Sequence, residues 1–502
     1  MDTSESVESP IVHECGQCQQ SGIASLAKIS SSSLVDVEIG DLLEWKNGHE
    51  PSCALCKLIG SVIEDASQRF DFVQERPASL KLIPKDQYTL LGLKFKERRD
   101  AYTEDVDSIF IYREPESKSP RGLCSYKRIP RNKDSDVCFE AFKEWIRDCR
   151  ENHRACRLPC ATSFPTRVLD IQGPDARLAE NLTTEDNYVA LSHCWGKEEF
   201  IKTEKSTFQS HKKCIELQSM PQNFKDAIHV CRALGYKYLW IDSLCIIQDD
   251  EQDWVEQSDL MEGIYHNADL VIAATCAPNA MSGFLTESRP SYREGTVSIS
   301  LQDTDNPTTF WYRLIPPHRC REGPLDDRGW AFQERLRARR YLSFGSREMT
   351  WLCQTSTHCE CEGAEVAGAQ WKNRERSLEL FLPYRTEKEL HKSWRREIVT
   401  LYTQRVLGRP SDKLIALSAI ATWFEEKLSG TYLAGLWERD LVLDLLWSTE
   451  IPSRRVKYKR ELGQYYTAPT WSWAACEGWT YYPLTPKNDD HEEHRITELL
   501  YF

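Results

Sequence analysis

The chain has 502 residues, which exceeds the usual size of one hydrophobic core, so we expect two to four packed units. Hydrophobic residues make up 40% of the chain and charged residues 28%, a balance that excludes a disordered chain and predicts a globular one. The net charge of -13 argues against a nucleic-acid binder, because phosphate recognition depends on a positive field.

The start of the chain and its apolar runs predict a cytoplasmic protein. MDTSESVESP lacks the basic start and the apolar stretch of a secretory signal. No apolar run approaches the roughly 20 residues that a membrane helix needs, so we expect no membrane span. The 19 cysteines are then expected to be reduced thiols or metal ligands rather than disulfides.

Residues 1–170 form a predicted Cys-containing N-terminal region. Two CxxC pairs, Cys15 with Cys18 and Cys53 with Cys56, have the paired spacing with which four thiolates hold a structural zinc ion. The gap between the pairs is longer than in common zinc ribbons, and the second pair also fits the buried face of the helix CALCKLIGSVIED. Zinc binding and core packing both stay open for these pairs.

A second cysteine cluster follows near the end of this region. Its members, which have ligand-like spacing, are Cys149, His153, Cys156 and Cys160. The first three also fall on one helical face, which favours core packing or a helix cap. A third group of cysteines, in WLCQTSTHCEC at residues 351–361, has no clear use on the sequence.

The middle of the chain alternates between predicted strands and helices. NYVALSHCWG is a short apolar run typical of a buried strand, and the next segment is an amphipathic helix between Pro221 and Gly235. Residues 238–247 are the predicted second strand, DWVEQSDLMEGIYHNA the second helix and DLVIAAT the third strand. This β-α-β-α-β order predicts an α/β fold with a doubly wound, mostly parallel sheet.

Candidate ligand-binding residues lie where these strands end. Ligands of open parallel sheets bind outside the C-terminal ends of the strands, and Ser192, Trp195, Gly196 and Asp249 fall at such ends. The acidic run at 249–253 also suits the first turn of a helix, where carboxylates favour the positive end of the macrodipole, and helix initiation is the preferred interpretation.

Asp242 stands inside the predicted second strand. A carboxylate in a strand core must be hydrogen-bonded or paired, or its pKa rises until it is neutral. A structural network and a functional site are equally compatible with this position.

Three separated blocks resemble a known family. YVALSHCWG, then YLWIDSLCIIQDDEQDW running on to MEGIYHNADLVIAAT, then RGWAFQERLRARRYLSFG resemble in order and spacing the signature blocks of the fungal heterokaryon-incompatibility (HET) domain. The resemblance is strongest over residues 185–350 and looser over most of the remaining chain. It implies a role in fungal non-self recognition, as the effector of a programmed cell death response. His193 and Gln257 stand where the family often has Tyr and Glu, so neither is a candidate for proton chemistry.

The family is also distantly similar to TIR domains, some of which cleave NAD with a glutamate on a helix that begins with Trp. Trp330 and Glu334 in RGWAFQERL resemble that pattern. NAD cleavage passes through an oxocarbenium-like cation that a carboxylate can stabilise. The resemblance therefore implies Glu334 as the catalytic carboxylate, Asp242 as the residue that orients the site, and Trp195 or Trp330 as a stacking surface for a ring. Alternatively, Glu334 pairs with an arginine of the basic cluster that ends at Arg340.

Two classes of function thus follow from the resemblance. One is an enzyme, a NAD glycohydrolase, and the other is a non-enzymatic signalling or assembly module that self-associates. We predict three regions, namely residues 1–170, a HET domain at 180–350, and a mixed helical and β accessory region at 351–502. In the last region LIALSAIATWFEEKL predicts a helix, and the spacing of Trp471 and Trp473 predicts a half-buried strand.

Overall fold

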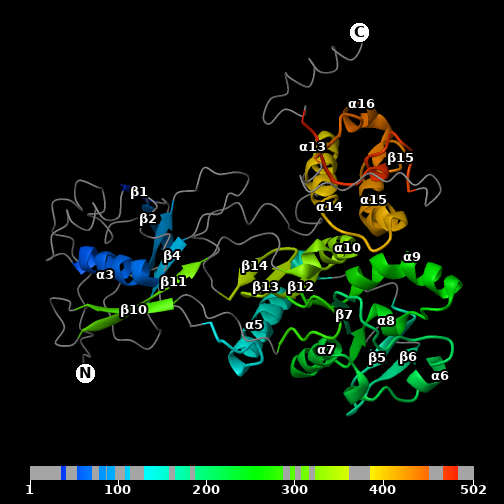
Figure 1. Cartoon of the computed structure of the whole chain (residues 1–502), viewed down its shortest axis with the longest axis horizontal. Coiled ribbons are helices and arrows are strands. Elements are labelled where there is room, and N and C mark those ends of the chain that lie inside the picture. Colours follow the sequence, from blue (N-terminus) through cyan, green and yellow to red (C-terminus); the bar gives the residue numbers. More distant parts are fainter. Residues whose placement is uncertain are drawn as a thin grey trace, which may run out of the picture. The chain divides into compact units, whose positions relative to one another are not determined.

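The computed structural model of the chain describes residues 35–40, 54–69, 78–85, 88–95, 108–112, 129–157, 164–180, 187–285, 294–299, 307–315, 323–360, 385–450 and 467–483 (Figure 1). Contacts divide the chain into two compact units. Unit 1 comprises Met1–Lys133, Ser288–Arg319 and His358–Asn373, and unit 2 comprises Asp134–Glu287, Cys320–Thr357 and Arg374–Phe502.

Unit 1 is built on a six-stranded sheet in the order β1-β2-β3-β4-β11-β10, in which every neighbouring pair is antiparallel. Its elements are β1 (Val35–Gly40), α3 (Ala54–Arg69), β2 (Ala78–Lys85), β3 (Tyr88–Phe95), β4 (Ser108–Tyr112), β10 (Glu294–Ile299) and β11 (Thr308–Ile315). Helix α3 buries Leu58, Ile59 and Val62 and contacts β10. An amphipathic helix that packs against an antiparallel sheet gives this unit its own apolar core.

The second sheet has eight strands in the order β14-β13-β12-β9-β7-β8-β5-β6, and the strands from β5 to β9 together with β12 and β13 belong to unit 2. Its strands are β5 (Arg167–Asp170), β6 (Arg177–Glu180), β7 (Tyr188–Ser192), β8 (Tyr238–Trp240), β9 (Leu270–Ala273), β12 (Arg340–Phe344), β13 (Met349–Cys353) and β14 (Thr357–Cys359). The helices around it are α5 (Asp136–Asn152), α6 (Phe208–His211), α7 (Gln222–Ala233), α8 (Asp242–Cys245), α9 (Glu251–Asn267) and α10 (Gly329–Arg337).

The fold is a mixed α/β fold, and the sheet is parallel only at its centre. Strands β12, β9, β7 and β8 pair in parallel, whereas β13 against β12, and β5 against both β8 and β6, are antiparallel. The expected mostly parallel sheet therefore holds for the four central strands and is wrong at both edges. The reason is the length of the connections, since the short links between β5 and β6 and between β12 and β13 allow only hairpins.

The predicted helices and strands of the central region are largely confirmed. The first helix is α7, which begins after Pro221 and is followed by Gly235 at a φ of +83°, and its buried face includes Phe224, Ile228 and Cys231. Strand β7 is buried at all five residues, as expected for a strand covered on both faces. The second predicted strand is too long, because β8 ends at Trp240 and the chain then turns into the short helix α8.

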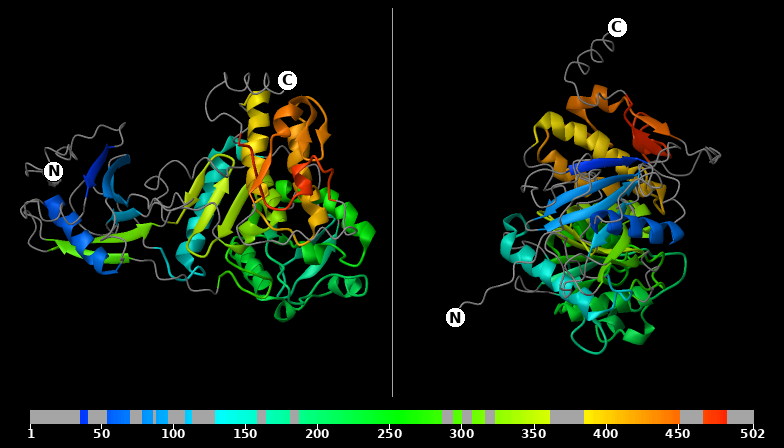
Figure 2. Two further views of the ribbon diagram at one scale, coloured as in Figure 1. Left: turned by 45° about the horizontal axis from the view of Figure 1, so that its top comes forward. Right: turned by 90° about the vertical axis from the view of Figure 1, so that its left-hand side faces the viewer.

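The C-terminal part of unit 2 forms a second apolar core, and both views in Figure 2 show its helices gathered together. Its elements are α13 (Glu387–Ser393), a π-helical turn (Trp394–Val399), α14 (Thr400–Tyr402), α15 (Ser418–Glu425), β15 (Tyr432–Leu433), β16 (Leu436–Trp437), α16 (Leu441–Asp444), β17 (Ser448–Glu450) and β18 (Trp479–Tyr481). Helix α10 joins this core through Phe332 and Leu336.

The sequence predictions for this part are correct for one element and wrong for another. The expected helix is present as α15. Trp471 and Trp473 do not lie in a strand, because Trp473 begins a short 3-10 helix and is fully buried while Trp471 is exposed. Their different exposure comes from the turn that precedes the 3-10 helix and not from strand alternation.

No helix within the part of the chain that the structure describes is long and apolar enough to cross a membrane.

Candidate functional site

The order of the parallel strands reverses between β7 and β9. Strand β8 follows β7 on one side, whereas β9 and then β12 lie on the other side. At such a reversal the chain leaves neighbouring strands in opposite directions, which opens a crevice at their C-terminal ends. Ser192 is the last residue of β7, and Asp242 lies two residues beyond the end of β8.

A cavity of about 830 Å³ lies next to these strand ends. Its volume falls in the range that small-molecule sites occupy. Its lining residues come from the loops after β7 and β8, from α9 and α10, and from the C-terminal part of unit 2. They are Trp195, Asp242, Ile246, Gln248, Asp249, Glu251, Trp254, Val255, Ser258, Met261, Arg328, Trp330, Glu334, Gly408, Arg409 and Asp412.

The structure brings most of the candidate site residues to this one cavity. Those that line it are Trp195, Asp242, Asp249, Trp330 and Glu334. Ser192 lies behind the wall, fully buried, where its hydroxyl donates a hydrogen bond to Oε2 of Glu334. Gly196 follows Trp195 in the loop after β7. The chemical roles assigned to these residues on the sequence stay predictions.

Among the acids that line the cavity, Glu334 has the pKa that departs most from its ordinary value. Helix α10 carries it, and only 3% of the residue is exposed. Burial raises the pKa of Glu334 to about 7, although the positive charge of Arg328 and the hydrogen bond from Ser192 act in the opposite direction. Near neutral pH this carboxyl can therefore either hold or release a proton.

The arginines near Glu334 are engaged elsewhere. Arg335 pairs with Asp326 at 3.4 Å, and the guanidinium of Arg328 donates to the backbone carbonyl of His193. Within the described ranges Glu334 makes no ion pair shorter than 4 Å. Among these residues, the alternative in which Glu334 is one half of a direct structural ion pair finds no contact, although the positive charge of Arg328 acts on the carboxyl from a longer distance.

Asp242 is not a carboxylate in the core of a strand. It opens helix α8, where its Oδ1 accepts from the backbone N–H of Ser243 at 2.7 Å. Its Oδ2 accepts from Nε1 of Trp195 at 2.8 Å. Asp242 thus holds the indole of Trp195 in place on the cavity wall, and its role in orienting a ligand stays a prediction. The strand prediction failed because three apolar residues in a row cannot distinguish a strand end from a buried helical turn.

His193 lies beneath Asp242 and stays neutral. Burial lowers the pKa of His193 to about 4, and Nδ1 of the ring is 3.8 Å from the carboxylate of Asp242. The ring also packs edge-on against Phe224, with the centroids 5.2 Å apart. An enclosed imidazole of this kind packs as part of the core behind the cavity.

The acidic run after β8 starts a helix, as expected. Asp250 is the N-cap of α9, and its side chain accepts from the backbone N–H groups of Gln252 and Asp253. Asp253 turns away from solvent and pairs with Arg167 at 2.6 Å. Asp249 accepts from the backbone N–H of Lys205 at 2.7 Å and also lines the cavity.

Gly196 is required by the backbone of the loop after β7. Its φ is +78°, a conformation that L side chains rarely adopt, and a Cβ at this position would lie 2.3 Å from Cβ of Asn279. The loop that carries Trp195 can therefore take this path only with glycine. Gly196 is therefore needed to position this loop, and its predicted role in ligand binding stays a prediction.

Sequence reasoning missed the contribution of the C-terminal region. Gly408, Arg409 and Asp412 line the cavity from the segment between α14 and α15. In the sequence these residues belong to the turn-forming run GRPSD, which predicts a surface loop. The run does not indicate which other part of the chain that loop contacts. Contacts between residues so far apart in the sequence depend on how α10 packs on the C-terminal core.

Zinc binding by the two CxxC pairs stays a prediction, because only one of their four cysteines lies among the described residues. Cys15, Cys18 and Cys53 lie outside the described residues, and Cys56 is buried in α3. A different thiol cluster is present in unit 2 and could bind a metal ion. It consists of Cys149, His153, Cys156 and Cys353, whose ligand atoms all lie within 4.8 Å of one another. Cys160 of the predicted second cluster also lies outside the described residues.

Comparisons with known proteins identify the domain that supplies most of the residues lining this cavity. No curated protein and no solved structure matches the chain, so the similarity to TIR domains stays a prediction. Residues 188–334 match the family described as heterokaryon incompatibility protein (HET), from the first residues of β7 to Glu334 itself. The match supports a role of the heterokaryon-incompatibility type. The chain therefore carries a heterokaryon incompatibility (HET) domain over residues 188–334.

Proposed function

We propose that this HET domain is a death effector that cleaves NAD, or a closely related nucleotide, at the bond between nicotinamide and ribose. The observation that carries the proposal is Glu334, a buried carboxyl with a pKa of about 7 that faces a cavity and makes no ion pair among the described residues. A buried acid without a direct ion pair is costly for the fold when it ionises, and such groups concentrate at functional sites.

The composition of the cavity fits a ligand with a cationic ring and a phosphate group. Acidic side chains outnumber the two arginines, Arg328 and Arg409, so a pyridinium ring is favoured near the acids. Trp195, Trp254 and Trp330 offer aromatic faces on which such a ring can stack. The arginines are suited to the pyrophosphate, because a guanidinium matches its geometry.

The reaction follows from the position of Glu334. A bound pyridinium favours the ionised form of this carboxyl, because an opposite charge nearby lowers a carboxyl pKa. When the C–N bond breaks, nicotinamide leaves as a neutral molecule and the positive charge moves to the ribose, where ionised Glu334 stabilises it. Water then attacks the anomeric carbon, and the products are nicotinamide, ADP-ribose and a proton. Ser192 holds the carboxylate in place, and Asp242 fixes Trp195.

The test follows NAD and free nicotinamide by chromatography with the full chain, clustered at high concentration. The wild type, Glu334→Gln and the exposed control Glu216→Gln are compared side by side. We expect nicotinamide to appear with the wild type and the control, and not with Glu334→Gln. Removal of a group that acts only on the transition state should lower the rate by about 100-fold or more.

Intact NAD in all three samples would overturn the enzymatic proposal. The same samples would then be examined for self-association, since the second function of this class is a non-enzymatic signalling or assembly module. Cleavage by the wild type and by Glu334→Gln at equal rates would also refute the assigned role of Glu334.

A further inference from the structure

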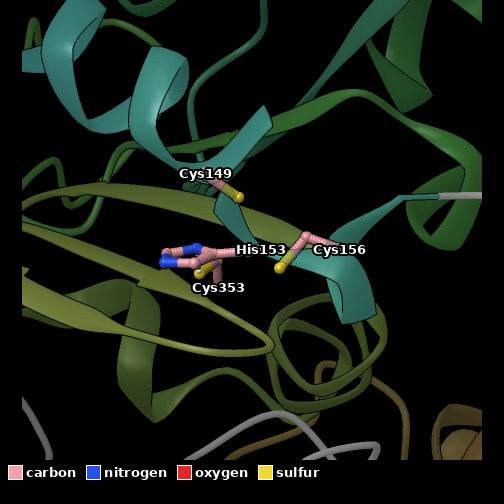
Figure 3. Close-up of side chains that lie close together, drawn as sticks. All are labelled: Cys149, His153, Cys156 and Cys353. Atoms are coloured by element: carbon pink, nitrogen blue, oxygen red, sulfur yellow. Dashed lines mark hydrogen bonds between the residues drawn. The ribbon is translucent and has the colours of Figure 1, made fainter. Parts of the chain in front are cut away.

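Three thiols and one imidazole converge away from the cavity. Cys149 lies in the last turn of α5, His153 directly follows that helix, Cys156 ends the 3-10 turn Arg154–Cys156, and Cys353 ends β13 (Figure 3). The three cysteines are buried, and all four ligand atoms lie within 4.8 Å of one another. The cluster therefore brings together α5, which precedes the first strand of the eight-stranded sheet, and β13, which lies near the end of that sheet in the sequence.

We propose that this cluster is a structural zinc site, with Sγ of Cys149, Cys156 and Cys353 and Nδ1 of His153 as the four ligands. Tetrahedral Zn²⁺ with Zn–S bonds of about 2.3 Å and a Zn–N bond of about 2.0 Å places its ligand atoms roughly 3.5 to 4 Å apart. Nδ1 of His153 and Sγ of Cys353 are 3.4 Å apart, and the remaining separations need to close by no more than about 1 Å.

The local backbone presents the first three ligands together. Cys149 and His153 are four residues apart at the end of a helix, so their side chains lie on one face. His153 is the C-cap of α5, and its N–H still donates to the carbonyl of Cys149 at 3.2 Å. The next turn returns the chain, because the N–H of Cys156 donates to the carbonyl of His153 at 3.1 Å. The preference for a helix cap is thus correct, and it does not exclude ligation.

The surroundings of Cys353 suit a thiolate. Its sulfur accepts from the backbone N–H groups of Thr355 at 3.4 Å and Ser356 at 3.2 Å. The hydroxyl of Ser356 lies 3.3 Å from the same sulfur. A neutral buried thiol in an ordinary core has no need of such donors, whereas hydrogen bonds to the charged form favour a thiolate.

Outer contacts complete the site. Oδ2 of Asp148 lies 3.4 Å from Nε2 of His153, so it can accept the proton on Nε2 and leave Nδ1 for the metal. Nε of Arg340 donates to Sγ of Cys149 at 3.2 Å. Three thiolates around Zn²⁺ leave one net negative charge. Arg340 and Arg150 share the single carboxylate of Asp269, so this group beside Cys149 carries one net positive charge that balances it.

Such an ion would connect α5 to the β12–β13 hairpin, elements that are about 200 residues apart in the sequence. A disulfide would use only two of the three thiols and would leave His153 without a role. Zinc is favoured over softer or redox-active metals because one imidazole and three thiolates in a tetrahedral arrangement form a closed structural site.

The first experiment measures metals and acid-labile sulfide in the full chain purified under reducing conditions. We expect about one zinc ion per chain, and Cys353→Ser should lose it, whereas Cys231→Ser, a fully buried cysteine of α7 outside the cluster, should keep it. Replacement of zinc by Co²⁺ should give the visible absorption of tetrahedral thiolate coordination. Iron with sulfide, or no metal in the wild type together with no binding of added Zn²⁺, would overturn the proposal.

A second variant guards against loss of folding in Cys353→Ser. Asp148 is partly exposed, with 44% of its side chain accessible to solvent, so Asp148→Asn should fold normally but bind zinc about 10- to 100-fold more weakly in a chelator competition. Glu144→Gln, on an exposed position of the same helix, should leave the affinity unchanged. Equal affinities of Asp148→Asn and the wild type would refute the ligation of His153 through Nδ1.

Discussion

Replacement of Glu334 by glutamine should stabilise the protein at alkaline pH. The pKa of this carboxyl is about 7 in the fold, against 4.5 for a solvated glutamate. Below pH 4.5 both the folded and the unfolded chain hold the proton, so the residue has no effect on the pH dependence. Between pH 4.5 and 7 the unfolded chain releases the proton while the folded chain retains it, so the free energy of unfolding decreases as the pH rises.

The size of this effect follows from the two pKa values. Each pKa unit corresponds to about 1.4 kcal/mol, so ionised Glu334 destabilises the fold by about 3 kcal/mol above pH 7. Glutamine has nearly the same shape, carries no charge, and keeps a carbonyl oxygen that can accept from Ser192. Glu334→Gln should therefore match the wild type at pH 4.5 and exceed its free energy of unfolding by about 3 kcal/mol at pH 8.

The assay is urea unfolding of the full chain, followed by tryptophan fluorescence at pH 4.5, 6, 7 and 8. Glu216→Gln, the same substitution at an exposed position, is the control and should differ little from the wild type at every pH. A difference between Glu334→Gln and the wild type that does not change with pH would refute the reasoning. Destabilisation that grows with pH would show that the ionised carboxylate is compensated in the fold. Together with the NAD assay, a more stable and inactive variant would separate loss of function from loss of fold.

Two further substitutions test the scaffold around the site. Asp269→Asn should destabilise the protein by about 3 kcal/mol at pH 7, because the buried guanidinium of Arg340, 2.7 Å from Asp269, loses its counter-ion. Burial alone would raise the pKa of Asp269, but the neighbouring arginines lower it. The loss of stability in Asp269→Asn, measured by denaturant titration, should therefore be full above about pH 4 and should shrink as the pH falls below that value. A loss of stability that persists unchanged in acid would contradict this account. In thermal unfolding, Gly196→Ala should lower the free energy of unfolding by at least about 2 kcal/mol more than Gly235→Ala does. Both glycines have a positive φ, but only a Cβ at position 196 would meet Asn279. Equal costs would show that the loop moves freely around that contact.

Much of the local structure could be predicted from the sequence, because it depends on residues close together in the chain. The apolar run of β7, the amphipathic face of α7 and the acidic start of α9 each follow from periodicity and from capping residues within one or two turns. Trp330 and Glu334 were placed on one helix by the resemblance to TIR domains and not by these signals, and both lie in α10. These signals failed at Asp242, where a short apolar segment fits both a strand and a buried turn.

Only the tertiary structure decided which of these elements meet. The cavity needs Arg409 and Asp412 from the C-terminal region, and the thiol cluster needs Cys353 beside Cys149, about 200 positions away. The structure also decided that Glu334 faces the cavity and makes no direct ion pair with a described arginine, although basic residues surround it in the sequence. Periodicity determines which face of an element is apolar, but the neighbour of that face depends on strand order and on the packing of whole helices, which no short stretch of sequence encodes.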